Sequence, residues 1–277
     1  MLQKHIIRKI VQSAIEEDAG EADVTTAAAL TGEETGKARA IAKSVVVVAG
    51  IDVFKETFLF LDPGMQFKGC CKDGDVVEKG GCLAEISGNL SRMLTAERVA
   101  LNFLQRMSGI ATLTRRYVDD VKGTKAKILD TRKTAPGLRY LDKYAVRIGG
   151  GHNHRFGLYD GVLIKDNHIA AAGGISQALA RVRGRLPHTL KVEIEVKNLQ
   201  ELAEAINSGA DVIMLDNMSL SDMGKAVAVA DGRVPLEASG NVTLANVRQI
   251  AETGVDFISV GALTHSVSAA NISLKIS

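Results

Sequence analysis

From about residue 126 onward, short apolar runs alternate with amphipathic segments, and this alternation restricts the possible folds more than any other feature of the sequence. Repeated strand and helix units of this kind build a parallel sheet. The intervening segment 199–209 has apolar residues at helical spacing and ends at Gly209, a typical helix stop. Its apolar face comprises Leu199, Leu202, Ala203 and Ile206. The candidate strands are residues 126–130, 161–165, 190–196, 211–217, 234–240 and 256–262.

Each candidate strand ends in polar or glycine residues, as expected at the rim of an α/β barrel, where the segments after the strands form the active site. An open doubly wound sheet is the alternative. However, no G-x-G-x-x-G motif follows the first strand, and no acidic residue follows at the spacing of a nucleotide site. The pattern therefore favours an α/β barrel.

The first hundred residues have a different character and predict a separate α+β module. Residues 45–48 form a β-branched run, and residues 74–88 read as short strands divided by glycine turns. Helical spacing over residues 91–112 predicts a long joining helix, with Ser108-Gly109 as a breaker near its end. We predict a first domain at 1–108 and a barrel domain at 109–277, whose last segment returns to the first domain.

Composition limits the class of protein. The formal net charge of +2 over 277 residues does not support nucleic-acid binding, and 46% hydrophobic residues suffice for a real core. Three cysteines form no disulfide framework and predict reduced thiols in a cytoplasmic protein. The N-terminus has no uninterrupted apolar segment, so secretion and membrane insertion are not expected.

Residues 130–168 hold a concentration of cations, histidines and glycines that predicts an anion site. Arg132 and Lys133 follow one apolar run and Lys165 follows the next, so these cations should meet at one sheet edge. Residues 149–155, GGGHNHR, combine close backbone approach with His and Arg donors. Spacing alone also leaves open a metal bound by His152 and His154.

Two carboxylates and two glycine turns complete the predicted rim. Glu195 and Asp216 end neighbouring strands and suggest a magnesium site or acceptors for ribose hydroxyls, while Glu193 shares the face of Glu195. Residues 239–241 and 260–262 follow the last two strands, where barrels commonly bind phosphate. The substrate should therefore carry a phosphate and further negative groups.

Taken together, the motifs TAERVALNFLQRMSGIAT, DTRKTAPGLR, KYAVRIGGGHNHRFGLYDGVLIKDNH, EIEV, MLDN, EASG and ETGVDFISVGALTHS resemble the quinolinate phosphoribosyltransferase family over nearly the whole chain. The resemblance implies an N-terminal α/β sandwich joined to an incomplete, open α/β barrel of TIM-like type. It implies transfer of phosphoribose from phosphoribosyl pyrophosphate (PRPP) to quinolinate with Mg2+, giving nicotinate mononucleotide, carbon dioxide and pyrophosphate in de novo NAD synthesis. It also implies a homodimer with shared active sites, or a higher oligomer.

The resemblance assigns roles residue by residue. Arg132, His154 and Arg155 hold the quinolinate carboxylates, with Thr131 and Lys165 beside them, and Arg98 enters the site of the neighbouring subunit. The implied catalytic set is Lys133, Lys165, Glu195 and Asp216, the last two facing ribose and Mg2+ directly or through water. Ser239, Gly240 and Gly261 correspond to the 5′-phosphate cradle.

Three alternatives remain at this point. A paralogue, such as the relative associated with molybdenum transport genes, would use the same fold with another acceptor, although the intact LIKDNH and GGGHNHR motifs argue against it. A Schiff-base aldolase would use Lys165 as its nucleophile. A non-catalytic barrel would bind PRPP without turnover.

Overall fold

The computed structural model describes residues 2–276. The chain forms two compact units. The first comprises Met1–Arg115, Ala135–Gly150 and Ser266–Ser277, and the second comprises Arg116–Thr134 and Gly151–His265. Both units are therefore discontinuous in sequence. Neither unit, over the described residues, has a helix with the length and apolar character needed to cross a membrane.

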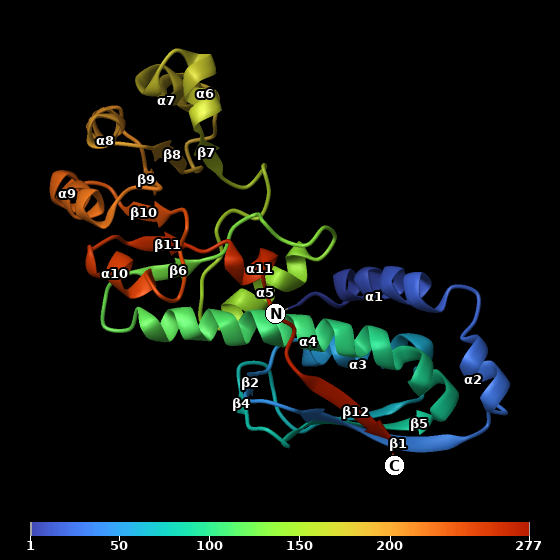
Figure 1. Cartoon of the computed structure of the whole chain (residues 1–277). Helices are drawn as coiled ribbons and strands as arrows, with labels where there is room; N and C mark the ends of the chain where they lie inside the picture. The colour runs from blue at the N-terminus through green and yellow to red at the C-terminus, as the bar shows by residue number, and fades with distance from the viewer. Residues whose placement is uncertain (1, 277) are drawn as a thin grey trace. The chain divides into compact units, whose positions relative to one another are not determined.

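The first unit is built on an antiparallel sheet with strand order β12-β1-β5-β3, and Figure 1 shows β12 beside β1. Its core joins the inner face of this sheet to helices α3 and α4. The C-terminal strand β12 pairs with β1, so the chain ends in the unit where it began. The strands are β1 (Thr35–Ala42), β2 (Val46–Val47), β3 (Gln66–Gly69), β4 (Val76–Val77), β5 (Cys82–Asn89) and β12 (Ile272–Ile276). The helices are α1 (Lys4–Ala19), α2 (Val24–Ala29), α3 (Ile51–Leu61), α4 (Leu90–Asp120) and α5 (Arg139–Ile148).

Helix α4 corrects one prediction from the sequence. It continues without interruption through Ser108 and Gly109 to Asp120, so these residues are not a breaker. A side chain at Gly109 would collide with the backbone oxygen of Ser268, which lies against the helix at this point. Ser108 is fully buried, and its hydroxyl accepts from the amide of Ala49 at 3.1 Å. Close packing explains both residues, whereas local sequence suggested a turn.

The second unit contains a six-stranded parallel sheet with a helix after nearly every strand. The strands are β6 (Lys127–Leu129), β7 (Val162–Ile164), β8 (Val192–Val196), β9 (Val212–Asp216), β10 (Leu236–Ser239) and β11 (Phe257–Ser259). The helices are α6 (Asp166–Ala172), α7 (Ile175–Arg183), α8 (Leu199–Asn207), α9 (Leu220–Ala230), α10 (Val247–Glu252) and α11 (Ala262–His265).

The strand order shows that this sheet is an opened barrel. The order is β6-β11-β10-β9-β8-β7, so consecutive strands are neighbours from β7 to β11, and β6 returns to lie beside β11. This is the cyclic order of a barrel with an opening between β6 and β7. A doubly wound sheet would instead reverse its order at a switch point. The predicted fold class, an incomplete α/β barrel with an N-terminal α/β domain, is confirmed.

Candidate active site

A cavity of about 530 Å3 lies at the carboxyl ends of the parallel strands, entirely within the second unit. Its wall brings together ten of the residues that the sequence predicted for the site. They are Thr131, Arg132, Lys133, His154, Arg155, Lys165, Glu195, Asp216, Ser239 and Gly240. Eight of these residues come from the ends of five separate strands, and His154 and Arg155 come from the segment before β7, so only the folded sheet assembles them.

Cations gather on the part of the wall formed by the segment after β6 and the segment before β7. Arg132 and Arg155 are both partly buried, and burial together with the charge of Arg132 lowers the pKa of Arg155. Arginine nonetheless stays protonated at neutral pH, so the wall keeps both positive charges. An anion bound between them would relieve their mutual repulsion, and the planar guanidinium groups suit carboxylates.

Lys165 and Glu195 form an ion pair across the ends of β7 and β8. The Nζ atom of Lys165 lies 3.2 Å from Oε2 of Glu195. The lysine side chain is 49% exposed, whereas that of Glu195 is 11% exposed. The ammonium can therefore move toward a ligand while Glu195 stays fixed. A Schiff base requires a free neutral amine, whereas the lysine amine here is paired with a carboxylate.

Asp216 is held in place by the turns that follow β9 and β10. Asn217 donates from Nδ2 to Oδ1 of Asp216 at 2.9 Å and accepts from Nδ2 of Asn241 at 3.0 Å. Both asparagines have left-handed backbones, which asparagine tolerates better than most residues. Gly240 has φ +100°, and a side chain there would collide with that of Asn217. Glycine is therefore required at position 240, both because of its positive φ and because the Asn217 side chain leaves no room for a Cβ atom.

A second acidic pair lies one layer deeper between the strands. Glu193 and Glu237 are both buried, and Oε2 of Glu193 lies 2.8 Å from Nε2 of His154. Oε2 of Glu237 lies 3.7 Å from the same nitrogen. Burial raises the pKa of Glu237 to about 8, and the adjacent Glu193 carboxylate adds to the rise while His154 opposes it. Glu237 therefore carries its proton at neutral pH.

His154 uses both ring nitrogens within the protein. Its Nδ1 accepts from the backbone N–H of Arg155 at 2.8 Å, so Nε2 carries the hydrogen and donates to Glu193. Its own backbone N–H donates to the buried Asp130 at 2.9 Å. The resemblance implied that His154 holds a carboxylate. In this structure it would have to release Glu193 or the Arg155 amide to do so.

Three candidates from the sequence lie elsewhere. Gly261 is outside the cavity wall but next to it, since a side chain there would meet Cδ of Lys133 at 3.2 Å. Arg98 belongs to the first unit, where it is exposed on α4 beside a hollow that also includes Asp23. His152 is exposed. Among the described residues, the side chains that lie close enough to His154 to share a metal ion with it are Glu193 and Glu237, and His152 is not one of them.

Sequence reasoning missed several residues of the wall. Glu237 is the most informative of them, and Leu163, Met214, Asn217 and Ser259 also line the cavity. Side chains two apart on a strand share a face, so Glu237 and Ser239 point the same way, as do Glu193 and Glu195. A carboxylate inside an otherwise apolar strand was the signal that could have identified Glu237.

Glu195 and Asp216 have the chemistry to hold a divalent cation. Mg2+ is usually bound by one or two carboxylates together with the phosphates of a substrate, and it keeps several waters. Two carboxylates on the wall of a cavity lined by cations meet this requirement.

Comparison with known proteins identifies the family. Residues 23–108 match "Quinolinate phosphoribosyl transferase, N-terminal domain", and residues 110–275 match the C-terminal domain of the same family. A "Probable nicotinate-nucleotide pyrophosphorylase [carboxylating]" of Bacillus subtilis is 44% identical over 270 residues, which cover 98% of this chain and 93% of the relative. A protein of the same description from Synechocystis is 46% identical, with 93% of this chain and 88% of the relative covered.

Solved structures agree with these sequence relatives. The nicotinate-nucleotide pyrophosphorylase of Francisella tularensis superposes with a TM-score of 0.96 at 42% identity, covering 100% of this chain and 98% of that one. The corresponding protein of Ehrlichia chaffeensis gives a TM-score of 0.95 at 42% identity, covering 100% and 99%. The similarity thus extends over both units.

Proposed function

Since this chain belongs to the quinolinate phosphoribosyltransferase family, we propose that it transfers phosphoribose from PRPP to quinolinate with decarboxylation. The products are nicotinate mononucleotide, carbon dioxide and pyrophosphate, and the step belongs to de novo NAD synthesis. One observation carries the proposal beyond the comparisons. A single cavity is lined by four cations, Arg132, Lys133, Arg155 and Lys165, together with the carboxylates Glu195 and Asp216.

The cationic wall would bind the acceptor. Quinolinate carries two adjacent carboxylates, and the guanidinium groups of Arg132 and Arg155 provide planar donors for them. His154 helps to position Arg155, because its ring accepts a hydrogen bond from the Arg155 amide. The His154 ring would contact the substrate only if it gave up its hydrogen bond with this amide or with Glu193. Lys165 lies beside Glu195, from where its positive charge would neutralise negative charge on quinolinate or on PRPP.

The acidic wall would stabilise the reacting sugar. Loss of pyrophosphate leaves positive charge on the ribose, and fixed carboxylates at Glu195 and Asp216 stabilise that charge without forming a covalent bond. Lys133 and Lys165 balance the charge of the departing pyrophosphate. Mg2+, held by Glu195 and Asp216 directly or through water, would supply further stabilisation of the phosphate oxygens when bound.

Glycosyl transfer should precede decarboxylation. Bond formation at the ring nitrogen makes that nitrogen positively charged, and the positive charge stabilises the electrons left when the neighbouring carboxylate departs. Carbon dioxide leaves, the ring carbon takes up a proton from solvent in its place, and the cationic wall retains the remaining carboxylate. Ser239, Gly240 and Gly261 would hold the 5′-phosphate, because they follow the late strands where barrels commonly bind phosphate.

A product assay tests the reaction. The protein is incubated with PRPP and Mg2+ and with either quinolinate or nicotinate, and carbon dioxide, pyrophosphate and nicotinate mononucleotide are measured. We expect equal amounts of all three from quinolinate and none from nicotinate. Turnover with another acceptor only would indicate a paralogue, and PRPP binding without turnover would indicate a binding protein.

We further propose a homodimer in which Arg98 of each subunit enters the site of the other. This rests on the family resemblance and on the exposure of Arg98 on α4. Mixing Arg98→Ala chains with Arg132→Ala chains should recover part of the activity, since some sites then contain neither change. Failure to recover activity, with mixed dimers shown by mass spectrometry, would contradict shared sites. The cytoplasmic location stays a prediction.

A further inference from the structure

Two cysteines of the first unit lie side by side on the outer face of its sheet. Strands β3 and β5 pair antiparallel, and the pairing continues past β3 because the amide of Cys70 donates to the carbonyl of Leu83 at 2.9 Å. In the pairing of β1 with β5, Ala40 lies opposite Ala84 and the next residue, Ile41, lies opposite Cys82. Leu83 is therefore an extra residue in β5, which forms a β-bulge. This bulge changes the side-chain alternation and turns Cys82 to the same face as Glu85.

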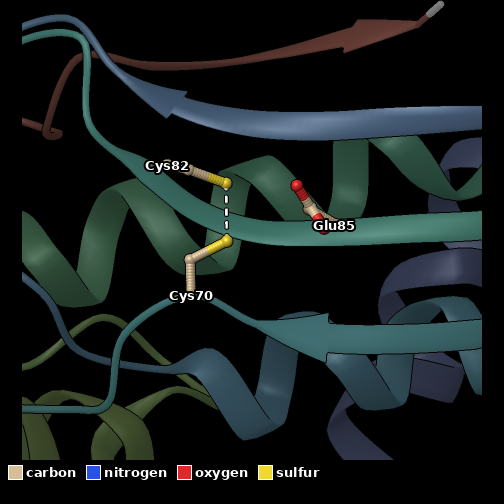
Figure 2. Close-up of side chains that lie close together, drawn as sticks. All are labelled: Cys70, Cys82 and Glu85. Atoms are coloured by element: carbon tan, nitrogen blue, oxygen red, sulfur yellow. Dashed lines mark hydrogen bonds between the residues drawn. The ribbon is translucent and has the colours of Figure 1, made fainter.

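The two thiols are within reach of each other. Their Sγ atoms are 2.7 Å apart, and Figure 2 shows the side chains pointing toward one another from neighbouring strands, with Glu85 beside them. Cys70 is exposed and Cys82 is partly exposed, so a small reagent can approach. Both are free thiols in the structure. Little movement is needed to join them.

The surrounding charges favour thiol chemistry at Cys82 over metal binding. Arg39 lies against Cys82 and is also 3.4 Å from Glu85, while Lys68 is 3.2 Å from Glu85. The two cations beside the cluster oppose the binding of a metal cation.

The three cysteines differ in reactivity. Partial desolvation by neighbouring groups and the hydrogen bond with Cys82 raise the pKa of Cys70 to about 12 although its surface is exposed, and burial raises the pKa of Cys71 to about 11. Both therefore remain thiols at neutral pH. Cys82, with the guanidinium of Arg39 beside it, is the better candidate for first attack.

We propose that Cys70 and Cys82 are a reversible oxidation site that closes to an intramolecular disulfide by exchange with a small-molecule disulfide such as oxidised glutathione. Cys82 thiolate attacks one sulfur of the reagent, forming a mixed disulfide and releasing one reduced thiolate. Cys70 then loses its proton, attacks Sγ of Cys82 and releases the second thiolate. The protein loses two hydrogens, and the reagent is reduced to two thiols. A reducing environment reverses both steps.

The bond would secure a segment that supports the rest of the first unit. The segment between the cysteines contains Asp73, whose carboxylate accepts from the amides of Gly50 and Ile51 at the start of α3 at 3.0 Å. The same carboxylate accepts from the hydroxyl of Tyr144 on α5 at 2.8 Å. Closing this loop limits the unfolded chain and should therefore raise the stability of the unit.

The test uses the full-length protein equilibrated in buffers of varying oxidised to reduced glutathione ratio, followed by quenching, alkylation and mass spectrometry. We expect the oxidised protein to lose about 2 Da and to retain one alkylatable thiol, Cys71. The melting temperature should rise by roughly 5 to 10 °C on oxidation. Cys71→Ser is the matched control and should close in the same way.

Single variants separate the two steps. Cys70→Ser should stop at a stable glutathione adduct on Cys82, and Cys82→Ser should remain mainly unmodified. The proposal is wrong if the wild-type protein keeps three reactive thiols at every ratio, or if the disulfide includes Cys71. Binding of zinc alone that blocks alkylation of Cys70 and Cys82, with no disulfide formed under oxidation, would also overturn it.

Discussion

Two acidic pairs lie at neighbouring depths of the opened barrel, and their environments differ. Glu195 and Asp216 end their strands, where Lys165 and Asn217 contact them. Glu193 and Glu237 lie one layer deeper, where His154 donates to Glu193 and lies 3.7 Å from Glu237, which holds a proton. Glu193 and Glu195 are two residues apart on the same strand, yet Glu193 is buried and Glu195 is partly exposed to solvent. We infer that the outer pair acts on the substrates and that the inner pair supports the wall.

Removing the mobile cation should have the largest effect. Lys165→Ala deletes a charge that serves both walls of the cavity, and we expect kcat/KM for quinolinate to fall by about 100- to 1,000-fold. Lys197→Ala is the matched control, because Lys197 is 53% exposed and pairs with Asp166 at 3.1 Å but does not line the cavity. Its kcat/KM should stay within about twofold. Equal losses of kcat/KM in the two variants, measured by steady-state kinetics, would contradict a specific role for Lys165 in the cavity.

Neutralising the two layers in turn should separate their roles. Glu195→Gln removes the negative charge that faces the sugar, so kcat should fall by about 100-fold with a smaller change in KM. Glu237→Gln replaces a carboxyl that is already neutral at pH 7 and should lower kcat by less than about tenfold. The assignment of layers fails if the Glu237 variant is the more impaired of the two.

The buried Glu237 carboxyl should make the free energy of unfolding depend on pH. Glu237 is protonated in both states below its usual pKa of 4.5, but between 4.5 and about 8 the unfolded chain is ionised while the folded chain keeps the proton. The free energy of unfolding should therefore fall as pH rises through this window and level off above it. Glu237→Gln should remove this slope and gain on the order of a few kcal/mol at pH 8.

Urea unfolding between pH 5 and pH 9 measures that slope. Glu17→Gln, on the exposed surface of α1, is the control and should keep the wild-type pH profile. An unchanged profile in the Glu237 variant would mean that this carboxyl is ionised in the folded protein.

A smaller effect should follow from loosening the outer layer. Asn217→Ala removes the amide that donates to Asp216 and must still adopt φ +54°, so we expect kcat to fall by roughly three- to tenfold. Asn207→Ala, at the exposed end of α8, should leave kcat unchanged. Steady-state kinetics at saturating PRPP would show the difference, and equal values for both variants would argue against a positioning role for Asn217.

The sequence predicted the outer layer better than the inner one, for physical reasons. Strand ends are marked by a change from apolar to polar residues, so Lys165, Glu195 and Asp216 could be identified before the structure. Glu237 lies inside a strand, and its proximity to Glu193 and His154 depends on the pairing of β8, β9 and β10. Local patterns contain no information on such neighbours.

Long-range packing also explains the wrong prediction along α4 and the difference between the two histidines. Gly109 reads as a breaker until the backbone of Ser268, far along the chain, is seen to lie against it. His152 and His154 are equivalent by spacing, yet one is exposed and the other contacts two buried carboxylates. The bulge that brings Cys82 beside Cys70 likewise appears only in the strand register.

Calorimetric titration of quinolinate and of nicotinate into the wild-type and Arg132→Ala proteins tests the cationic wall most directly. If Arg132 and Arg155 bind two carboxylates, quinolinate should bind the wild-type protein at least about tenfold more tightly than nicotinate. The Arg132→Ala change should remove most of that preference. Equal binding of both ligands to the wild-type protein, or a preference that survives the substitution, would contradict the assignment of this cavity to a dicarboxylate acceptor.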